Sequence, residues 1–389
     1  MIYLDNHSTT RLDPRVLEAM LPWLTDHYGN AGSTTHEMGR EARTAVDAAR
    51  ERFASVIGAS AREIVFTSGA TESNNLAILG TAARLGNARG HVVTIATEHH
   101  AVLDPIEHLE REGHRVTRLP VAPRTGFVKP GDVAAAIRPD TFLVSVMLSN
   151  NEIGTILDIP AIAAVAHAHA AVLHVDAAQA LGRIAVDVDV LDADLVSFSA
   201  HKAHGPKGAG SLYVRRRGRA IRIDPLVFGG GQERGMRSGT LDVPGIVGMA
   251  EAARLAADDL SSEQPRLRDL RDRLWKGLRE ALPGIALNGP PLDDPAVRLA
   301  NNLNIHIPGI DGQTLLATLA ADGLAVSSGS ACSSESPRPS HVLQAIGLSD
   351  DEARASVRFG LSRFTTEDEI ERATAMIAAG VAQLRIRTG

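Results

Sequence analysis

Short apolar runs alternate with longer stretches of helical spacing between about residues 60 and 215. The runs are Ile64–Phe66, Val92–Ile95, Val116–Leu119, Phe142–Met147, Val172–Val175, Leu195–Phe198 and Ser211–Val214, and Ile159–Ala171 is one of the helix-like stretches between them. Strands that alternate with helices form a mostly parallel sheet covered on both faces. We therefore predict an α/β protein with a mostly parallel, seven-stranded sheet in its larger part.

The length of the chain predicts a second, smaller domain. A chain of 389 residues is too long for one small core. Residues 255–280 are rich in Arg, Leu, Asp and Glu at helical spacing, which predicts a helix leading out of the larger domain. Asn302–Ile307 is predicted to be a strand, with two helices after it. We expect a large domain over residues 12–255 and a small α+β domain formed by residues 1–11 and 256–389.

Charge and hydropathy exclude several classes of partner. The net charge is −6 and no long basic run occurs, so we expect no nucleic acid partner. No apolar stretch reaches membrane-spanning length. Residues Met1–Asp5 show no basic region followed by an apolar stretch, so we expect a cytoplasmic protein. The single cysteine, Cys332, excludes an intrachain disulfide framework.

A single lysine lies in a small polar turn that follows one predicted strand. The turn runs from Ser199 to Gly208, directly after Leu195–Phe198. A lysine amine is a weak nucleophile at its ordinary pKa of about 10.4. Burial beside cationic or polar groups frees its lone pair for a Schiff base. Lys202 is therefore a candidate for a covalent bond to a carbonyl compound, and a solvated surface lysine is the alternative.

A carboxylate lies at the carboxyl end of the preceding predicted strand. Asp176 follows Ala171–Val175, and ligands bind at this edge of open α/β sheets. A carboxylate there can keep a pyridinium nitrogen protonated, so that pyridoxal 5'-phosphate (PLP) acts as an electron sink. Capping of the next helix is the alternative role for this residue.

Small residues lead into a predicted helix after the strand Ile64–Phe66. The segment Thr67–Asn75, which includes Ala70 and Thr71, precedes the helix-like stretch Leu76–Leu85. Free N–H groups at a helix N-terminus attract an anion, and the helix dipole adds to that attraction. The segment predicts a phosphate site without the Gly-Lys-Ser/Thr ending of a P-loop. An ordinary N-cap is the alternative.

Taken together, these segments resemble the cysteine desulfurases, a family of PLP enzymes with the fold-type I, class V aminotransferase-like fold. Matching segments are Tyr3–Asn6, Tyr28–Asn30, Ser68–Asn75, Thr97–Leu103, Asn150–Gly154, Val175–Gln179, Ser199–Lys202, Gly229–Thr240, Ser327–Cys332 and Arg358–Phe364. They follow the order of the family and cover nearly the whole chain, which makes the resemblance specific. The cysteine segment is similar to the NifS/IscS type with a long cysteine loop.

The resemblance implies a set of residues around the cofactor ring. Lys202 would bind PLP covalently, and Asp176 would pair with the pyridinium nitrogen. Gln179 would donate to the phenolic oxygen of the ring. His99 would stack on the ring and exchange protons with the substrate. Asn151 would lie near the ring oxygen and the substrate carboxylate.

The resemblance also implies contacts to the phosphate, one of which crosses a subunit interface. Ala70, Thr71, Ser199 and His201 match positions at the cofactor phosphate. Thr240 matches a threonine that reaches the phosphate in the other subunit, which implies a homodimer. The glycine-rich loop around Thr240 fits a backbone packed close to another chain, and a helix cap is the alternative.

The resemblance implies two further residues, one that binds the substrate and one that accepts its sulfur. Arg358 matches the arginine that binds the substrate carboxylate, for which a planar guanidinium is well suited. Arg363 is the rival, and a strand over residues 358–364 would point the two side chains to opposite faces. Cys332 matches the catalytic cysteine, and its small, polar, Pro-rich surroundings predict an exposed loop. A thiolate there would attack the substrate sulfur.

The implied reaction converts L-cysteine to L-alanine and passes the sulfur, as a persulfide on Cys332, to an acceptor protein. Iron–sulfur cluster assembly and other sulfur trafficking are the candidate pathways. A selenocysteine preference, another PLP reaction such as transamination, and a scaffold role remain open. We expect no metal site, because His167 and His169 face different directions on a helix and no Cys cluster or His-Glu-x-x-His spacing occurs.

Overall fold

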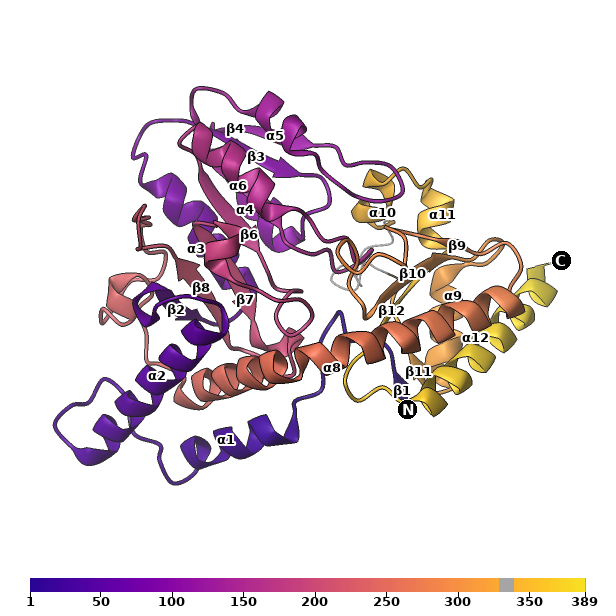
Figure 1. Cartoon of the computed structure of the whole chain (residues 1–389), viewed down its shortest axis with the longest axis horizontal. Coiled ribbons are helices and arrows are strands. Elements are labelled where there is room, and N and C mark those ends of the chain that lie inside the picture. The colour runs from indigo at the N-terminus through magenta and orange to yellow at the C-terminus, as the bar shows by residue number, and fades with distance from the viewer. Residues whose placement is uncertain (329–338, 389) are drawn as a thin grey trace.

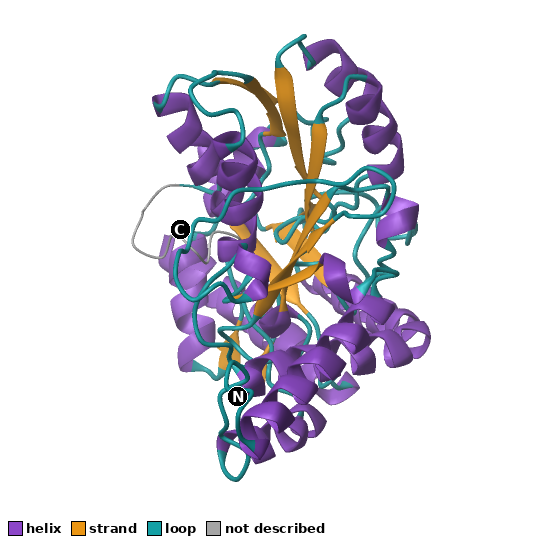
Figure 2. Ribbon diagram, turned by 90° about the vertical axis from the view of Figure 1, so that its left-hand side faces the viewer, coloured by secondary structure: helices purple, strands orange, loops and turns teal. Residues whose placement is uncertain are grey.

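The computed structural model of the chain describes residues 1–328 and 339–388. Figure 1 shows a helix-covered sheet on the left and a smaller group of strands and helices on the right. The long helix α8 runs beneath both parts. Turned by 90°, the molecule shows strands running through its middle with helices to either side (Figure 2).

The larger part is built on a seven-stranded sheet, as predicted. Its strands are β2 (Ile64–Thr67), β3 (His91–Ile95), β4 (Arg115–Leu119), β5 (Thr141–Met147), β6 (Val172–Asp176), β7 (Leu195–Ser199) and β8 (Gly210–Val214). They lie in the order β2-β8-β7-β6-β5-β3-β4. Strand β8 is antiparallel to both of its neighbours, β2 and β7, and the other neighbouring pairs of this sheet are parallel. The predicted α/β class with a mostly parallel sheet is therefore confirmed.

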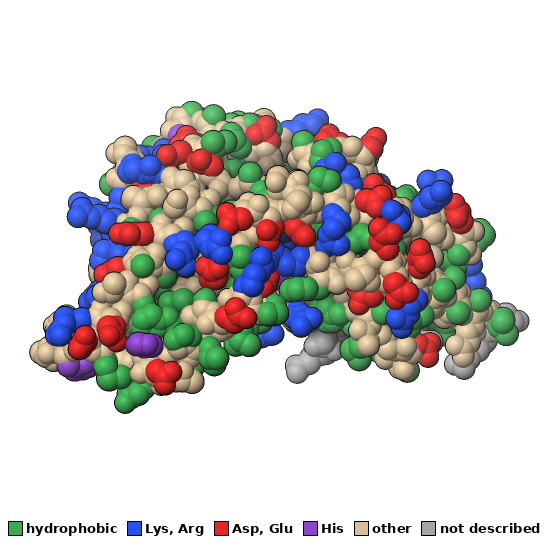
Figure 3. All heavy atoms as spheres, turned by 60° about the horizontal axis from the view of Figure 1, so that its bottom comes forward, with side chains coloured by type: hydrophobic (Ala, Val, Ile, Leu, Met, Phe, Trp, Pro, Cys, Tyr) green, Lys and Arg blue, Asp and Glu red, His purple; other side chains and the backbone are tan. Residues whose placement is uncertain are grey.

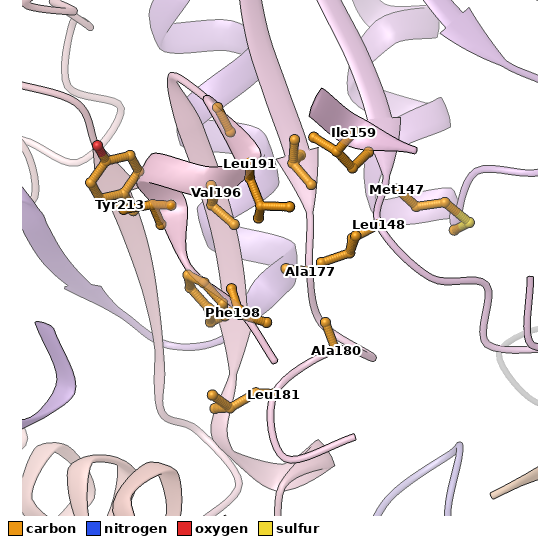
Figure 4. Packing of buried hydrophobic residues seen from close by; sticks show 14 of the residues in the cluster. Met147, Leu148, Ile159, Ala177, Ala180, Leu181, Leu191, Val196, Phe198 and Tyr213 are labelled. Atoms are coloured by element: carbon orange, nitrogen blue, oxygen red, sulfur yellow. The ribbon is translucent and has the colours of Figure 1, made fainter. Parts of the chain in front are cut away.

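Helices cover both faces of this sheet. They are α1 (Pro14–Leu24), α2 (Glu37–Val56), α3 (Ala70–Ala83), α4 (His100–Arg111), α5 (Pro130–Ala136), α6 (Ile159–Ala168) and the short α7 (Val188–Leu191). Helix α6 ends three residues before the predicted end, because Ala170 adopts a left-handed φ of 58°. Buried aliphatic and aromatic side chains fill the space beneath (Figure 4), and the rings of Phe53 and Phe198 meet edge to face at 5.5 Å.

Helix α8 (Val243–Ala281) has 39 residues and begins well before the predicted helix at 255–280. Its first half is rich in Gly and Ala, so it lacks the amphipathic pattern on which the prediction rests. Asp242 caps this half by accepting a hydrogen bond of 3.1 Å from Gly245 N. The first half packs Met249 into the core beneath the sheet, and the second half packs Leu274 into another core.

That other core belongs to the smaller part. Its strands are β1 (Ile2–Tyr3), β9 (Ala286–Leu287), β10 (Asn302–His306), β11 (Leu324–Ala325) and β12 (Ser356–Gly360), and its helices are α9 (Gly312–Ala321), α10 (His341–Ala345), α11 (Asp350–Arg354) and α12 (Glu367–Thr388). Four helices are thus described where two were predicted, because α10 and α11 are too short to show a helical period in the sequence.

The N-terminus is built into this smaller part. Strand β1 pairs in parallel with β11, and Ile2 and Leu4 pack in the same core as Phe359 of β12. Strand β10 lies between β9 and β12 and is antiparallel to both. The C-terminal residues contribute to both cores, because Val342 and Leu343 of α10 pack into the core beneath the large sheet. No helix among the described residues is both long and apolar enough to span a membrane.

Candidate active site

A cavity of about 1160 Å³ opens where the larger and smaller parts meet. Its floor includes the last residues of three neighbouring parallel strands, Met147, Asp176 and Ser199. The residues predicted for the site that line this cavity are Ala70, Thr71, His99, Asn151, Asp176, Gln179, Ser199, His201, Lys202 and Arg358. These residues come from segments far apart in the sequence, and the fold brings them together in one cavity.

Lys202 lies in the turn that follows β7. Residues Ala200–Lys202 form a single 3-10 turn, which directs the lysine back across the end of the sheet. Its Nζ donates hydrogen bonds of 2.6 Å to the carbonyl oxygen of His7 and 2.7 Å to that of Ser8. The amine is therefore held at a defined point in the cavity by backbone of the N-terminal segment.

Asp176 ends β6 with its carboxylate held from two sides. Oδ2 accepts a 2.7 Å hydrogen bond from Asn74 Nδ2, and Oδ1 accepts one of 2.9 Å from Ala178 N. The carboxyl group of Asp176 thus lines the cavity in a fixed orientation at the carboxyl end of the sheet, where a ring nitrogen could pair with it.

A second carboxyl group lies behind Asp176. Glu98 is fully buried, and its Oε1 accepts a 2.5 Å hydrogen bond from Met147 N. Met147 and Asp176 are register partners on β5 and β6, which brings the two carboxyl groups near one another. Burial, with the charge of Asp176 adding to it, raises the pKa of Glu98 well above its usual range. Glu98 therefore favours its protonated form beside Asp176.

His99 precedes α4 and acts as its N-cap. Its Nδ1 accepts a 3.0 Å hydrogen bond from Ala101 N, so the neutral ring carries its proton on Nε2. Burial lowers the pKa of His99 below its usual value, while the nearby Asp176 acts in the opposite sense. The cap fixes the ring at the cavity wall and keeps it neutral at neutral pH.

The N-terminus of α3 forms an anion cradle at one end of the cavity. Gly69 precedes the helix with a φ of 151°, and no described side chain caps it. Ala70, Thr71, Ser199 and His201 surround this point. Burial, with Lys202 and Lys207 nearby, lowers the pKa of His201 to about 4. A neutral imidazole and free helical N–H groups suit a phosphate.

The side chain of Gln179 contacts the N-terminal segment. Its Nε2 donates 2.9 Å to the carbonyl oxygen of His7, and its Oε1 accepts from Arg183 and lies 3.1 Å from His7 Nδ1. Gln179 lines the cavity as predicted, and its orientation depends on two residues that the sequence analysis did not single out.

The two candidate arginines lie in different places. Arg358 lines the cavity from β12, whereas Arg363 bonds to Asp13 and Asp259 outside it. The strand predicted over residues 358–364 ends earlier than expected, because β12 stops at Gly360. Alternation along a strand therefore does not decide between the two arginines. The turn after Gly360 carries Arg363 away from the cavity.

Thr240 does not line the cavity of this chain. It is exposed, in the loop that connects β8 to α8. This loop is anchored by a buried ion pair in which Arg50 donates two hydrogen bonds, of 2.6 and 2.7 Å, to Glu233. Arg237 of the same loop donates 2.8 Å to Glu72 in the first turn of α3. The loop is thus tied to the anion cradle.

Cys332 lies outside the described residues, and the residues on either side of its segment lie at the cavity. Ser327 exchanges backbone hydrogen bonds with Arg358, of 2.6 and 3.2 Å. Beyond the segment, Pro339 and Ser340 line the cavity, and Ser340 Oγ donates 2.6 Å to Glu152.

Five residues of the site were missed by the sequence analysis: His7, Ser8, Asn74, Glu98 and Arg183. Asn74 and Glu98 lie inside motifs quoted above, but the sequence does not show that both lie next to Asp176. His7, Ser8 and Arg183 belong to the site through contacts between segments that are distant in the sequence. Within the described part of the chain, no group of three or more His, Cys, Asp or Glu side chains is arranged to hold a metal ion.

Comparisons with known proteins identify the family of the chain. The family model of class V aminotransferases matches residues 2–373. A cysteine desulfurase IscS from Methylobacillus flagellatus is 50% identical over 385 residues, which cover 99% of this chain and 93% of that protein. A solved NifS-like protein superposes with a TM-score of 0.91 at 38% identity, covering 98% of this chain and 100% of the other. A structure of SspA in complex with cysteine has a TM-score of 0.80 at 37% identity, over 94% and 100% of the two chains.

Proposed function

This chain belongs to the class V aminotransferase family, among its cysteine desulfurases, and we propose that it uses PLP to convert L-cysteine to L-alanine and passes the sulfur to an acceptor protein. The observation that carries the proposal is the meeting of three groups in one cavity. These are the lysine amine of Lys202, the buried carboxylate of Asp176 and the anion cradle at the start of α3.

The residues of this cavity fit PLP. Lys202 would hold its aldehyde carbon, and Asp176 would hold its ring nitrogen. Gly69 and Thr71 of the cradle would hold its phosphate. A Cβ at Gly210 would come within 2.7 Å of the carbonyl carbon of Gly69, so a glycine there allows the cradle to lie tightly on β8. When bound, PLP supplies an electron sink for a carbanion at the substrate Cα.

The residues around that sink have separate tasks. Arg358 binds the substrate α-carboxylate through paired hydrogen bonds, as a guanidinium does best. Lys202 Nζ takes the proton from Cα, and the neutral His99 exchanges its Nε2 proton with the substrate. Asp176 faces the ring nitrogen, and the buried Glu98 behind it favours its protonated form.

Cys332 receives the sulfur in this proposal. Its thiolate forms an S–S bond to the substrate sulfur as the Cβ–S bond breaks, which leaves a persulfide on Cys332 and gives alanine after protonation. The described residues next to the segment support this role, because Ser327 pairs with Arg358 and Ser340 lines the cavity. The acceptor would be a protein of iron–sulfur cluster assembly or of another sulfur pathway.

We further propose that two chains form a homodimer in which Thr240 reaches the phosphate in the other subunit. Thr240 is exposed and does not line the cavity of its own chain, which fits that role. Hydrophobic side chains gather on the face of the molecule that comes forward in Figure 3. On α1 the exposed apolar residues are Leu17, Leu21 and Leu24, which share one face of the helix. Such an apolar face is suited to burial against a second copy of the chain.

The two cores support a division into a large domain over residues 12–255 and a small one over 1–11 and 256–389. Helix α8 passes from one core to the other between Met249 and Leu267. The cavity would then lie between domains, which is where ligand sites often occur.

A single-turnover assay with L-cysteine tests the proposed function. It follows the visible absorbance, the release of alanine and the mass of the peptide that contains Cys332. We expect a yellow protein that gives alanine and gains one sulfur at Cys332. Alanine without a persulfide would indicate a lyase, and a protein that stays colourless with added PLP would refute the proposal. Cys332→Ala should keep the yellow cofactor and lose sulfur transfer.

A further inference from the structure

A four-residue segment at the N-terminus contacts both the arginine and the lysine of the proposed site. Asp5–Ser8 runs beside β12, where Gly360 N donates 2.6 Å to Leu4 O and Asn6 N donates 3.2 Å to Gly360 O. A Cβ at Gly360 would come within 2.8 Å of His7 N, so the segment lies directly on the strand that carries Arg358.

The Arg358 guanidinium is held from this segment. Its Nη2 donates 2.9 Å to Asp5 Oδ1 and 2.8 Å to Ser8 Oγ. Ser8 Oγ in turn donates 2.8 Å to the same Asp5 oxygen, which closes a three-membered network. The side chain of Arg358 is 2% exposed and that of Asp5 is 19% exposed. A buried guanidinium needs a counter-charge, and Asp5 supplies it.

The same segment also holds the lysine. The carbonyl oxygens of His7 and Ser8 accept from Lys202 Nζ at 2.6 and 2.7 Å. Ser8 is therefore shared between the two groups, with its side chain on Arg358 and its backbone on Lys202. The separation of the two cationic groups is fixed through this one residue.

We propose that Asp5 and Ser8 are positioning residues that aim Arg358 at the substrate carboxylate, and that they thereby set the preference of this site for amines that carry an α-carboxylate. This inference rests on the proposed role of Arg358. A guanidinium held on one edge by a charged and a hydroxyl acceptor keeps its direction without substrate, so less ordering is needed when the substrate binds.

The test compares L-cysteine with cysteamine, which has the same amine and thiol but no carboxylate. Binding of each to the PLP-loaded protein is followed by the change in cofactor absorbance. Because a hydrogen bond to a charged group contributes strongly to binding, we expect Asp5→Asn to weaken L-cysteine binding about tenfold. Cysteamine binding should stay at the wild-type value, and Ser8→Ala should act in the same direction as Asp5→Asn.

Asp272→Asn is the matched control. Asp272 pairs with a guanidinium as buried as that of Arg358, Arg271, at 2.7 Å, and it does not line the cavity. Equal weakening of both amines by Asp5→Asn, no change, or tighter L-cysteine binding would overturn the inference.

A reference variant separates this inference from the proposed function. Arg358→Gln should remove the preference for L-cysteine over cysteamine. If it does not, the proposed role of Arg358 fails. If it does, while Asp5→Asn leaves the preference intact, only the positioning role is wrong.

Discussion

Asn74 donates a 2.7 Å hydrogen bond from Nδ2 to Oδ2 of Asp176, and both side chains are buried. This bond joins α3, whose N-terminus forms the anion cradle, to the end of β6, where the carboxylate lies. One helix therefore sets the distance between two groups that would hold opposite ends of the cofactor.

Asn74→Ala should weaken PLP binding by the apoprotein about tenfold, because the buried carboxyl group of Asp176 loses a hydrogen-bond partner that holds it in place. Titration with PLP, followed by fluorescence quenching, measures the change. Asn75→Ala is the matched control, because Asn75 donates to Thr71 O within its own helix. An unchanged affinity in Asn74→Ala would show that the bond does not support the ring end of the site.

Gly210→Ala should push the cradle off the sheet, because the new Cβ would meet the backbone of Gly69 rather than a side chain that can move. We expect weaker binding of PLP and no change for pyridoxal, which has no phosphate. Gly131→Ala serves as the control, since a Cβ at Gly131 meets nothing within 4 Å. An equal loss of affinity for PLP and for pyridoxal would show that the substitution does not act on the phosphate cradle.

Glu233→Gln should leave the buried Arg50 without its counter-charge. Loss of one partner of a buried ion pair costs about 3–5 kcal/mol of unfolding free energy. The double variant Arg50→Gln/Glu233→Gln should lose less unfolding free energy than the two single variants lose in total. Urea unfolding of the three variants measures these losses.

The exposed ion pair Arg273–Asp269 is the control for the buried pair, because its two side chains are 49% and 59% exposed. Asp269→Asn should change the unfolding free energy far less than Glu233→Gln does, because water screens an exposed pair. Strictly additive effects of the Arg50 and Glu233 substitutions would contradict the coupling.

The stability of the fold should fall as pH drops below about 6.5. His174 is fully buried between Ser145 Oγ at 2.8 Å and Ser197 Oγ at 3.0 Å, and burial lowers its pKa to about 3. The unfolded chain takes up this proton below its ordinary pKa while the folded chain does not. The stabilisation is therefore present above pH 6.5 and is lost progressively towards pH 3, by about 1.4 kcal/mol per pH unit.

Urea midpoints at pH 7.5 and pH 5 measure this dependence. His174→Gln should show a smaller loss between the two values than the parent chain. His108→Gln, at an exposed position, should keep the parent slope. An identical slope in all three proteins would show that His174 does not carry the effect.

Local patterns were sufficient to predict the sheet and much of the cavity. Each of the seven apolar runs became a strand, since burial of a parallel strand needs a continuous apolar segment. Lys202 and Asp176 were predicted from their places at strand ends, and the structure brings both into one cavity. Roles in catalysis stay predictions for these residues.

The parts that escaped prediction depend on contacts between distant segments. Asn6 Nδ2 donates to Gly360 O across 354 positions of sequence, and no local pattern marks such a pairing. The raised pKa of Glu98 likewise depends on burial and on Asp176 at the end of β6, while the hydrogen bond from Met147 N acts in the opposite sense. Residues 243–254 of α8 were missed because they are rich in Gly and Ala and lack amphipathic spacing.

The pairing of the N-terminal segment with β12 has a consequence for synthesis of the chain. The ribosome makes Ser8 350 residues before Arg358, so the contacts of Asp5 and Ser8 with this arginine cannot form until β12 has been made. The large sheet can assemble before Asp5 has its partner on β12. A nascent chain stalled before β12 would therefore hold the N-terminal segment through Gln179, Arg183 and Lys202, and the carboxylate of Asp5 would still lack its guanidinium.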